Sequence, residues 1–386
     1  MELLFWTSAA LIAYVYVGYP LALAFWARVR GGTGATGVIG AAGAGAAGAG
    51  AAGAAGAAGI EPAVSIVIAV RNEAPRLRAR IENLLTLDYS GERQIIVVSD
   101  GSTDGPEEAL AEARGRVELV EVSARGKAAA LNVGVARAAH DIVVFADARQ
   151  TFARDALRML VAPFADPRVG GVTGELVLDT ELDGTPPAGD SAVGEGVGLY
   201  WRYEKALRRF ESAVGSTLGA TGAIYALRRS LWQPLPAETL LDDVLAPMRA
   251  VLDGHKVVFE DRAKAFDEAS PDARVESRRK IRTLAGNVQI LWLEPRLLIP
   301  IVNPVWLQYM SHKCGRLVVP YALAALLVSS AWLVREHWLY ATALVAQCGF
   351  YLLAAYGAWL AEGTPTPART ALDPTPSIAA GRRSEV

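Results

Sequence analysis

The stretch that decides the fold is residues 94–104, which read Gln94-Ile95-Ile96-Val97-Val98-Ser99-Asp100-Gly101-Ser102-Thr103-Asp104. An apolar, β-branched run that breaks abruptly into acidic, hydroxyl and glycine residues is typical of a buried parallel strand followed by a sharp turn. Ligands of open α/β sheets bind beyond the carboxyl ends of the strands. We therefore expect Asp100 and Asp104 to lie where a ligand would be met.

The same pattern occurs at two other places in the chain. The apolar run 64–70 leads into Arg-Asn-Glu at 71–73, and the run 142–145 leads into Ala-Asp-Ala-Arg at 146–149. Three strand ends that each deliver a carboxylate to one edge of a sheet are hard to explain by packing alone. We interpret this edge as a binding site.

Strand-like and helix-like segments alternate through the first half of the polar region. Strands are expected at 64–70, in the run that begins at Gln94, at 117–122 and at 142–145, with helices at 76–87, 107–114 and 127–139. Four strands joined by three crossovers make a parallel half-Rossmann sheet, so the predicted fold class is α/β. No Gly-x-Gly-x-x-Gly follows the first strand, which argues against a dinucleotide site and leaves a mononucleotide site open.

The pattern changes after Asp147. We expect a strand at 170–178, an acidic Gly/Pro loop at 179–196 and an amphipathic helix at 199–214. Further on, Asp242 and Asp243 are adjacent carboxylates in apolar surroundings, which is costly unless they are solvated, bound to metal or catalytic. The alternative is a pair that caps a helix at 244–252.

Three nearly uncharged segments explain the positive mean hydropathy of +0.25. They cover residues 3–27, 317–334 and 338–360, and each is long enough to cross a hydrocarbon core of roughly 30 Å. The first lacks a basic region before it and is too long for a signal peptide, so we interpret it as a retained anchor. The short charged hairpin 335–337 between the last two favours membrane spans over buried core helices.

Basic residues flank all three segments and predict their orientation. Arg28 and Arg30 follow the first, Lys313 and Arg316 precede the second, and a pair of arginines at 382–383 follows the third. By the positive-inside rule, the polar middle of the chain is cytoplasmic and the N-terminus is outside. We expect an integral protein of the plasma (inner) membrane.

These features divide the chain into seven parts. They are a transmembrane anchor (1–27), a Gly/Ala-rich linker (28–60), a catalytic domain (61–285), an amphipathic interface segment (286–316), two transmembrane helices (317–334 and 338–360) and a disordered tail (361–386). The net charge of −2 gives no sign of nucleic-acid binding. Only two cysteines, Cys314 and Cys348, are present, which excludes a disulfide framework and a cysteine zinc site.

Taken together, the motifs resemble a known family. Residues 64–73 (VSIVIAVRNE), 99–104 (SDGSTD) and 126–132 (GKAAALN), followed by the acidic pair at 242–243, look like the membrane-bound inverting family 2 glycosyltransferases of the GT-A fold. That family includes cellulose, chitin, hyaluronan and poly-N-acetylglucosamine synthases. The similarity runs from about residue 64 to the last span; each motif alone is weak, but four in order are a strong signal.

The resemblance implies roles for residues at the donor side. Glu73 and Asp100 would hold the nucleoside, and Lys127 would lie near the nucleotide. Asp147 would hold a divalent cation, Mg²⁺ or Mn²⁺, on the diphosphate. The family's usual Asp-x-Asp here reads Asp147-Ala148-Arg149. An arginine therefore stands where a second carboxylate is expected, which leaves the metal weakly held and gives Arg149 itself as a group that could neutralise the diphosphate.

The resemblance also implies an acceptor side. Asp243 would be the catalytic base that takes a proton from the acceptor hydroxyl. Asp242, Gly222, Arg279 and Arg282 would be acceptor or membrane-proximal residues. The family's Gln-x-x-Arg-Trp motif corresponds to Arg279 through Thr283, and only its arginine is kept, as Arg282.

The missing tryptophan puts long-chain polymerisation in doubt, because that residue stacks on the acceptor sugar in processive synthases. The alternative reading of the segment is a basic surface that faces lipid.

The expected function is transfer of a sugar from a nucleotide-diphosphate sugar to a saccharide or lipid acceptor, with inversion, at the cytoplasmic membrane face. The main alternative is an inactive nucleotide-binding membrane subunit of a polysaccharide synthase complex. A sugar-phosphate nucleotidyltransferase is disfavoured by the spans and by the acidic pair. Two C-terminal spans are few for an unaided polysaccharide channel, so we expect a homo-oligomer or a synthase partner. We expect no nucleic-acid partner.

Overall fold

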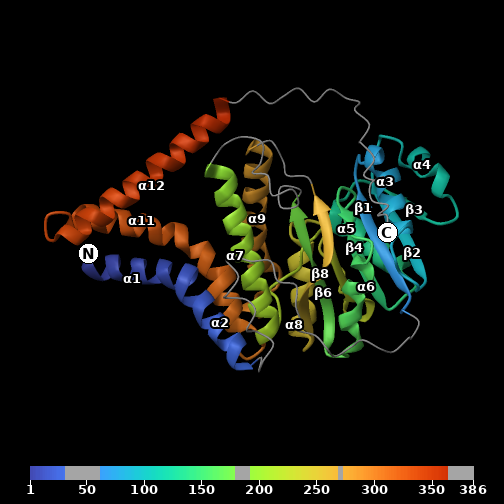
Figure 1. Ribbon diagram of the computed structural model, residues 1–386, viewed down its shortest axis with the longest axis horizontal. Coiled ribbons are helices and arrows are strands. Elements are labelled where there is room, and N and C mark those ends of the chain that lie inside the picture. Colours follow the sequence, from blue (N-terminus) through green and yellow to red (C-terminus); the bar gives the residue numbers. More distant parts are fainter. Residues whose placement is uncertain (31–60, 179–191, 268–272, 364–386) are drawn as a thin grey trace, which may run out of the picture.

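The computed structural model describes residues 1–30, 61–178, 192–267 and 273–363. The predicted linker from residue 31, most of the predicted loop 179–196 and the tail after residue 363 lie outside these ranges. Within them, the sheet domain lies to one side of the molecule and a group of long helices to the other (Figure 1).

The described part of the chain forms one eight-stranded sheet in the order β3-β2-β1-β4-β7-β6-β8-β5. Four strands are parallel and form the predicted half-Rossmann unit: β1 (Val64–Val70), β2 (Arg93–Asp100), β3 (Glu118–Val122) and β4 (Ile142–Ala146). Because their registers align Val70 with Ser99 and Asp100 with Val122, the carboxyl ends of β1, β2 and β3 reach the same edge. The predicted α/β fold class is confirmed.

The other half of the sheet is mixed, which the sequence did not predict. It contains β7 (Ile224–Arg228), β6 (Val169–Leu178), β8 (Lys256–Asp267) and the short β5 (Thr151–Phe152). Strand β7 runs antiparallel between β4 and β6, while β6 and β8 are parallel to each other. This insertion continues the sheet beyond β4 and places the end of β8 beside the loop that follows β4.

Helices cover both faces of the sheet. The α-helices described between the first span and residue 293 are α3 (Ala74–Leu85), α4 (Pro106–Ala109), α5 (Lys127–Arg137), α6 (Ala156–Val161), α7 (Ala192–Val214), α8 (Asp242–Leu252) and α9 (Ala273–Leu293). One core cluster joins the sheet to α3 and α6, and a second joins it to α5 and α8. Helix α5 approaches closely because Gly134 faces β1, where a Cβ atom would lie 2.4 Å from Val67.

Three predicted boundaries need correction. The helix predicted at 107–114 is a single turn, α4, followed by a 3₁₀ turn, and the loop predicted to residue 196 ends earlier because α7 begins at Ala192. Helix α8 begins at Asp242 with Leu241 as its N-cap, so the capping-pair alternative is wrong. Both carboxylates lie in the first turn, where the helix dipole favours negative charge.

Three of the described helices are long and apolar enough to cross a membrane. The first, Glu2–Arg30, combines α1 (Glu2–Ala13), a π-helical turn and α2 (Tyr19–Arg30). The second, Trp306–Leu333, combines α10 (Trp306–Gln308), a π-helical turn at Tyr309–Cys314 and α11 (Gly315–Leu333), and the third lies in α12 (Trp338–Gly363). The second helix begins well before residue 317, so it absorbs the end of the segment that we assigned to the interface.

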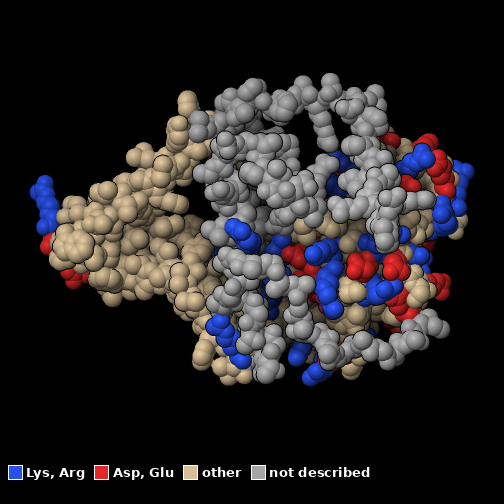
Figure 2. Space-filling view, viewed as in Figure 1, with Lys and Arg blue, Asp and Glu red and all other residues tan. Residues whose placement is uncertain are grey.

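The outer surface of these helices is apolar. Leu21, Tyr321 and Leu352 are each at least 65 % exposed. On the face in Figure 2, the charged side chains of this group of helices are at its two ends, the far tip and the end beside the sheet domain, and the visible surface between them is tan. A surface of this composition matches a hydrocarbon environment and not water.

Candidate functional site

The residues that carry the predicted chemistry meet at the carboxyl edge of the parallel strands. Lys127 begins α5, and its Nζ lies 2.9 Å from Asp147 Oδ1 and 3.6 Å from Asp242 Oδ2. Burial acts to lower the pKa of Lys127, but Asp242, Asp147 and Asp243 outweigh it and raise the pKa. The structure therefore gathers a charged lysine and three carboxylates from α5, the end of β4 and the start of α8.

Asp243 has the properties of a proton acceptor. Burial and the neighbouring Asp242 raise its pKa to about 6, against the opposing charges of Lys127 and Lys313. The N–H of Gly222 donates to Asp243 Oδ2 at 3.1 Å. A carboxyl group with this pKa is ionised at neutral pH and is a stronger base than an ordinary aspartate.

Asp100 is bonded to its own chain. Its carboxylate is buried and accepts hydrogen bonds from the N–H groups of Arg125 at 2.7 Å and of Gly126 at 3.0 Å. It thus fixes the loop that leads directly into Lys127. Asp100 therefore helps to position the start of α5 in this structure.

Two other predicted acidic residues also engage the chain. Glu73 forms an ion pair with Arg76 in the first turn of α3, and Asp104 accepts the N–H of Ala74 at 2.8 Å. Asn72, with a positive φ of 54°, accepts the N–H of Thr103 through its side chain at 2.9 Å. The loops after β1 and β2 are therefore tied to each other at the rim of the site.

Arg149 has a partner that the sequence did not reveal. Its guanidinium lies 2.6 Å from Asp267 at the end of β8, and the Gln150 amide donates to the same carboxylate at 3.0 Å. The Asp267 side chain is only 1 % exposed. Arg149 is thus held by Asp267, away from Asp147.

The residues present do not form a metal site on their own. Asp147 is a single carboxylate and already accepts a hydrogen bond from Lys127. Within the described ranges, no group of three or more His, Cys, Asp or Glu side chains is close enough to hold a metal ion. A cation that Asp147 meets would have to arrive with other ligands.

Helix α9 carries the predicted basic pair and packs beside the acidic pair. Arg282 donates to the carbonyl of Leu240 at 3.3 Å, and Gln289 accepts the Leu240 N–H at 2.9 Å. A Cβ atom on Gly286 would lie 2.5 Å from Leu241. Arg282 therefore supports the segment that enters α8, whereas Arg279 is exposed on the helix surface.

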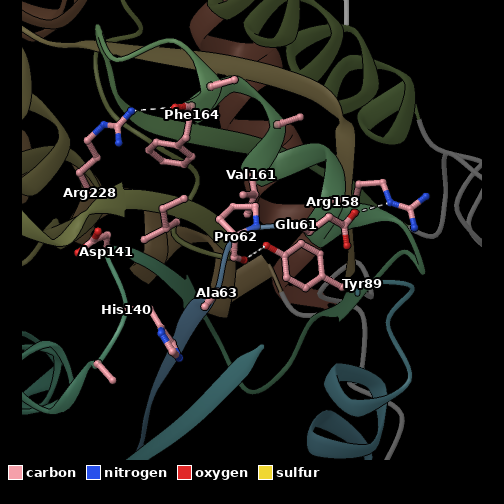
Figure 3. Close-up of a pocket in the computed structure, with 14 residues that line it drawn as sticks. Glu61, Pro62, Ala63, Tyr89, His140, Asp141, Arg158, Val161, Phe164 and Arg228 are labelled. Atoms are coloured by element: carbon pink, nitrogen blue, oxygen red, sulfur yellow. Dashed lines mark hydrogen bonds and ion pairs between the residues drawn. The ribbon is translucent and has the colours of Figure 1, made fainter. Parts of the chain in front are cut away.

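A cavity of about 690 Å³ lies at the opposite edge of the sheet, before the starts of β1 and β4 (Figure 3). Its cations already have partners: Arg158 pairs with Glu61 at 2.7 Å, and Arg228 donates to the carbonyl of Phe164 at 2.8 Å. The aspartates of the carboxyl edge do not line this cavity. The candidate site is therefore the carboxyl edge and not this cavity.

Residues 65–232 match the family described as Glycosyl transferase family 2. This part of the chain is therefore a glycosyl transferase family 2 domain, and the resemblance that the motifs indicated is confirmed.

Two curated relatives are poly-β-1,6-N-acetyl-D-glucosamine synthases. That of Staphylococcus aureus (strain COL) is 32 % identical over 115 residues, which are 29 % of this chain and 28 % of the synthase. That of Staphylococcus epidermidis is 24 % identical over 237 residues, which are 59 % of this chain and 55 % of the synthase. The matches thus span about half of these relatives or less.

A solved structure supports the fold over nearly the whole chain. The mannosyltransferase PcManGT from Pyrobaculum calidifontis, in complex with GDP-Man and Mn²⁺, superposes with a TM-score of 0.66 at 22 % identity. The match covers 92 % of this chain and 94 % of that one. The GT-A fold is confirmed.

Proposed function

We propose that this protein transfers a sugar from a nucleotide-diphosphate sugar to a hydroxyl of a saccharide or lipid acceptor, at the cytoplasmic membrane face and with inversion. The observation that carries this proposal is Asp243. It is a carboxylate with a pKa raised to about 6, and charges of the Lys127 and Asp147 pair act on it. It follows the segment 65–232 that matches glycosyl transferase family 2.

In the proposed step, Asp243 takes the proton of the acceptor hydroxyl while that oxygen attacks the anomeric carbon. The bond from this carbon to the diphosphate oxygen breaks, and its electron pair leaves with the diphosphate. Because attack and departure occur on opposite faces, a single displacement inverts the configuration. In this proposal Lys127, which pairs with Asp147, supplies positive charge to the developing diphosphate.

A divalent cation fits this proposal only if it binds together with the nucleotide-sugar donor. Mg²⁺ and Mn²⁺ commonly bind through one or two carboxylates together with substrate phosphates. Asp147 is the residue that would meet such an ion. The solved structure of PcManGT contains Mn²⁺ together with GDP-Man, which is in line with this.

The decisive experiment measures release of nucleoside diphosphate by the detergent-solubilised protein from a panel of UDP-, GDP- and dTDP-sugars with saccharide and lipid acceptors. We expect turnover with one donor class, and loss of turnover in Asp243→Asn with donor affinity kept within a few-fold, because an amide cannot accept the proton. Asp253→Asn, at the exposed far end of α8, is the matched control. Near-normal turnover by Asp243→Asn would falsify the assignment of the base.

Nucleotide binding by the wild-type protein with no turnover of any donor would instead favour the inactive-subunit alternative. The anomeric configuration of the product, read by NMR, tests inversion separately.

A further inference from the structure

Helix α7 presents one polar face to two different parts of the molecule. Glu204, Arg208 and Glu211 are spaced at i, i+4 and i+7, so they lie along a single face of the helix. In Figure 1, α7 stands between the long apolar helices and the sheet. This face contacts the membrane helices through its glutamates and the active-site loop through its arginine.

The glutamates receive side chains from both neighbouring spans. Tyr19 of α2 donates its hydroxyl to Glu211 at 3.1 Å, and His312 Nδ1 lies 2.7 Å from the same oxygen. Arg316, at the start of α11, forms an ion pair with Glu204. The Glu211 side chain is only 1 % exposed, so this is an interior contact and not a solvated surface pair.

Arg208 reaches in the other direction, towards the base. Its guanidinium donates to Thr221 Oγ1 at 2.5 Å. The next residue, Gly222, donates its N–H to Asp243 Oδ2 at 3.1 Å, and Ala220 donates its N–H to the Asp243 carbonyl at 2.6 Å. The loop that contains Thr221 therefore accepts a hydrogen bond from Arg208 on one side and donates hydrogen bonds to Asp243 on the other.

The loop has little freedom to compensate for a lost contact. A Cβ atom on Gly222 would lie 3.0 Å from Asp243 Oδ2, so a larger residue there would push against the carboxylate. Gly219 has a φ of +134°, which an L side chain rarely adopts. The Thr221 N–H donates to Thr173 Oγ1 at 2.8 Å. The hydroxyl of Thr221 itself is then available to accept the hydrogen bond from Arg208.

We propose that Arg208 is a positioning residue for the catalytic base: it fixes Thr221, and thereby the Gly222 N–H, against the Asp243 carboxylate. Through Glu204 and Glu211, the same helix face ties this geometry to the membrane helices. The proposal rests on the assignment of Asp243 as the base. It adds a residue that acts on that base without touching substrate.

The charged groups that face Asp243 are Asp242 and Asp147, which raise its pKa, and Lys127 and Lys313, which lower it. Arg208 is not among the largest of these charges, and its proposed effect on Asp243 passes through the Thr221 hydrogen bond. A hydrogen bond to the ionised form of a carboxylate lowers its pKa. Loss of the Gly222 N–H should therefore make Asp243 harder to ionise.

The experiment compares Arg208→Met with Arg209→Met in the full-length, detergent-solubilised protein. Arg209 is the next residue of α7 and pairs with Asp261 at 3.1 Å on an exposed surface. For Arg208→Met we expect kcat to fall about tenfold, with KM for the donor unchanged. The acidic limb of the kcat–pH profile should move up by about one unit, because that is the typical worth of one hydrogen bond to a charged group. Arg209→Met should match the wild type.

Thr221 supplies the second arm, which stays informative if Arg208→Met fails to fold. Thr221→Ser keeps the hydroxyl and should retain both kcat and the pH profile, whereas Thr221→Val should reproduce Arg208→Met. The double variant Arg208→Met/Thr221→Val should be no worse than the poorer single variant, since both remove one contact.

The inference is overturned if Arg208→Met or Thr221→Val shows a normal kcat and an unmoved acidic limb. That result, with Asp243→Asn still inactive, would sink the positioning role and leave the proposed function intact. An active Asp243→Asn would instead remove the proposed base itself.

Discussion

Asp243 lies among charges of both signs, so its protonation can be moved in either direction by single substitutions. Burial and Asp242 raise its pKa to about 6, while Lys127 and Lys313 oppose this shift. The base must be ionised to accept a proton, so activity should be lost as the pH falls through this value. The acidic limb of the rate profile therefore reports the environment of one carboxylate.

We expect kcat of the wild-type protein to be half-maximal near pH 6 on its acidic side. Asp242→Asn removes a neighbouring negative charge and should move this limb to lower pH, with part of the activity kept. Lys127→Met removes a stabilising positive charge and should move the limb to higher pH, in addition to slowing the reaction. If the acidic limbs of these two variants moved in the same direction, or if neither moved, a group other than Asp243 would control the pH profile.

The ion pair of Arg149 and Asp267 predicts unequal effects of its two partners on stability. Asp267 is 1 % exposed and Arg149 is 40 % exposed. Arg149→Met leaves the buried Asp267 carboxylate with the Gln150 amide but without a positive charge, and should cost about 2 kcal/mol, because a buried charge without an opposite charge is unfavourable. Asp267→Asn leaves an arginine that water can reach, so its cost should be smaller.

Thermal unfolding of the detergent-solubilised variants measures this difference, with the exposed Arg154→Met as the control. A larger loss of melting temperature in Asp267→Asn than in Arg149→Met would contradict the burial argument. The residue at the position of the usual second carboxylate thus forms an ion pair with Asp267.

Among the structural elements, the parallel half of the sheet could be predicted because its signals are local. The runs that end in Glu73, Asp100 and Asp147 show both the strands and the edge at which they meet. The mixed half depends on contacts between distant segments. Strand β7 inserts between β4 and β6, and Asp267 follows Arg149 by 118 positions, so neither partner can be inferred from local pattern.

The candidate site, like the sheet, could be predicted from the sequence only in part. The resemblance implied roles for Lys127 and Asp147 at the nucleotide and for the acidic pair at the acceptor. In the structure Lys127 Nζ lies 2.9 Å from Asp147 and 3.6 Å from Asp242. The sequence could not show whether Asp100 faces a ligand or its own chain. An aspartate at the end of a strand is expected in either case. Arg208 was visible only as one of several arginines on an amphipathic helix; its role depends on where α7 packs.

The connection from β2 to α5 can be tested through Asp100. Its carboxylate accepts the N–H groups of Arg125 and Gly126, so Asp100→Ala leaves two backbone donors without their acceptor and frees the loop that begins α5. We expect a lower melting temperature and, through displacement of Lys127, an affinity for nucleotide reduced by about ten- to a hundredfold.

Calorimetry with nucleoside diphosphates measures the affinity, and Asp141→Ala at the opposite edge of the sheet is the control. Lys127→Ala should lose affinity to a similar degree with less effect on the β2–α5 loop. An Asp100→Ala protein with unchanged melting temperature and weaker binding would point to direct contact with the donor instead.

For the molecule as a whole, the arrangement of charges at the two ends of the apolar helices sets an expected orientation in the membrane. Arg28 and Arg30 lie at the end of the first span, and Arg30 donates to the carbonyl of Val214 in α7 at 2.6 Å. Glu2, at the other end of that span, accepts the Tyr340 hydroxyl at 3.5 Å. The basic ends are therefore next to the catalytic domain, and the N-terminus lies beside the hairpin that joins α11 to α12.

Because basic flanks stay in the cytoplasm, we expect this hairpin outside and the catalytic domain inside the plasma membrane. With Cys314 and Cys348 replaced by serine, a single cysteine at Glu336 should react with a membrane-impermeant maleimide in intact cells. A cysteine at Glu82, exposed on α3, should react only after the membrane is permeabilised. The reverse pattern would place the active site on the outer face, where nucleotide sugars made in the cytoplasm cannot reach Lys127, so the proposed donor and the orientation stand or fall together.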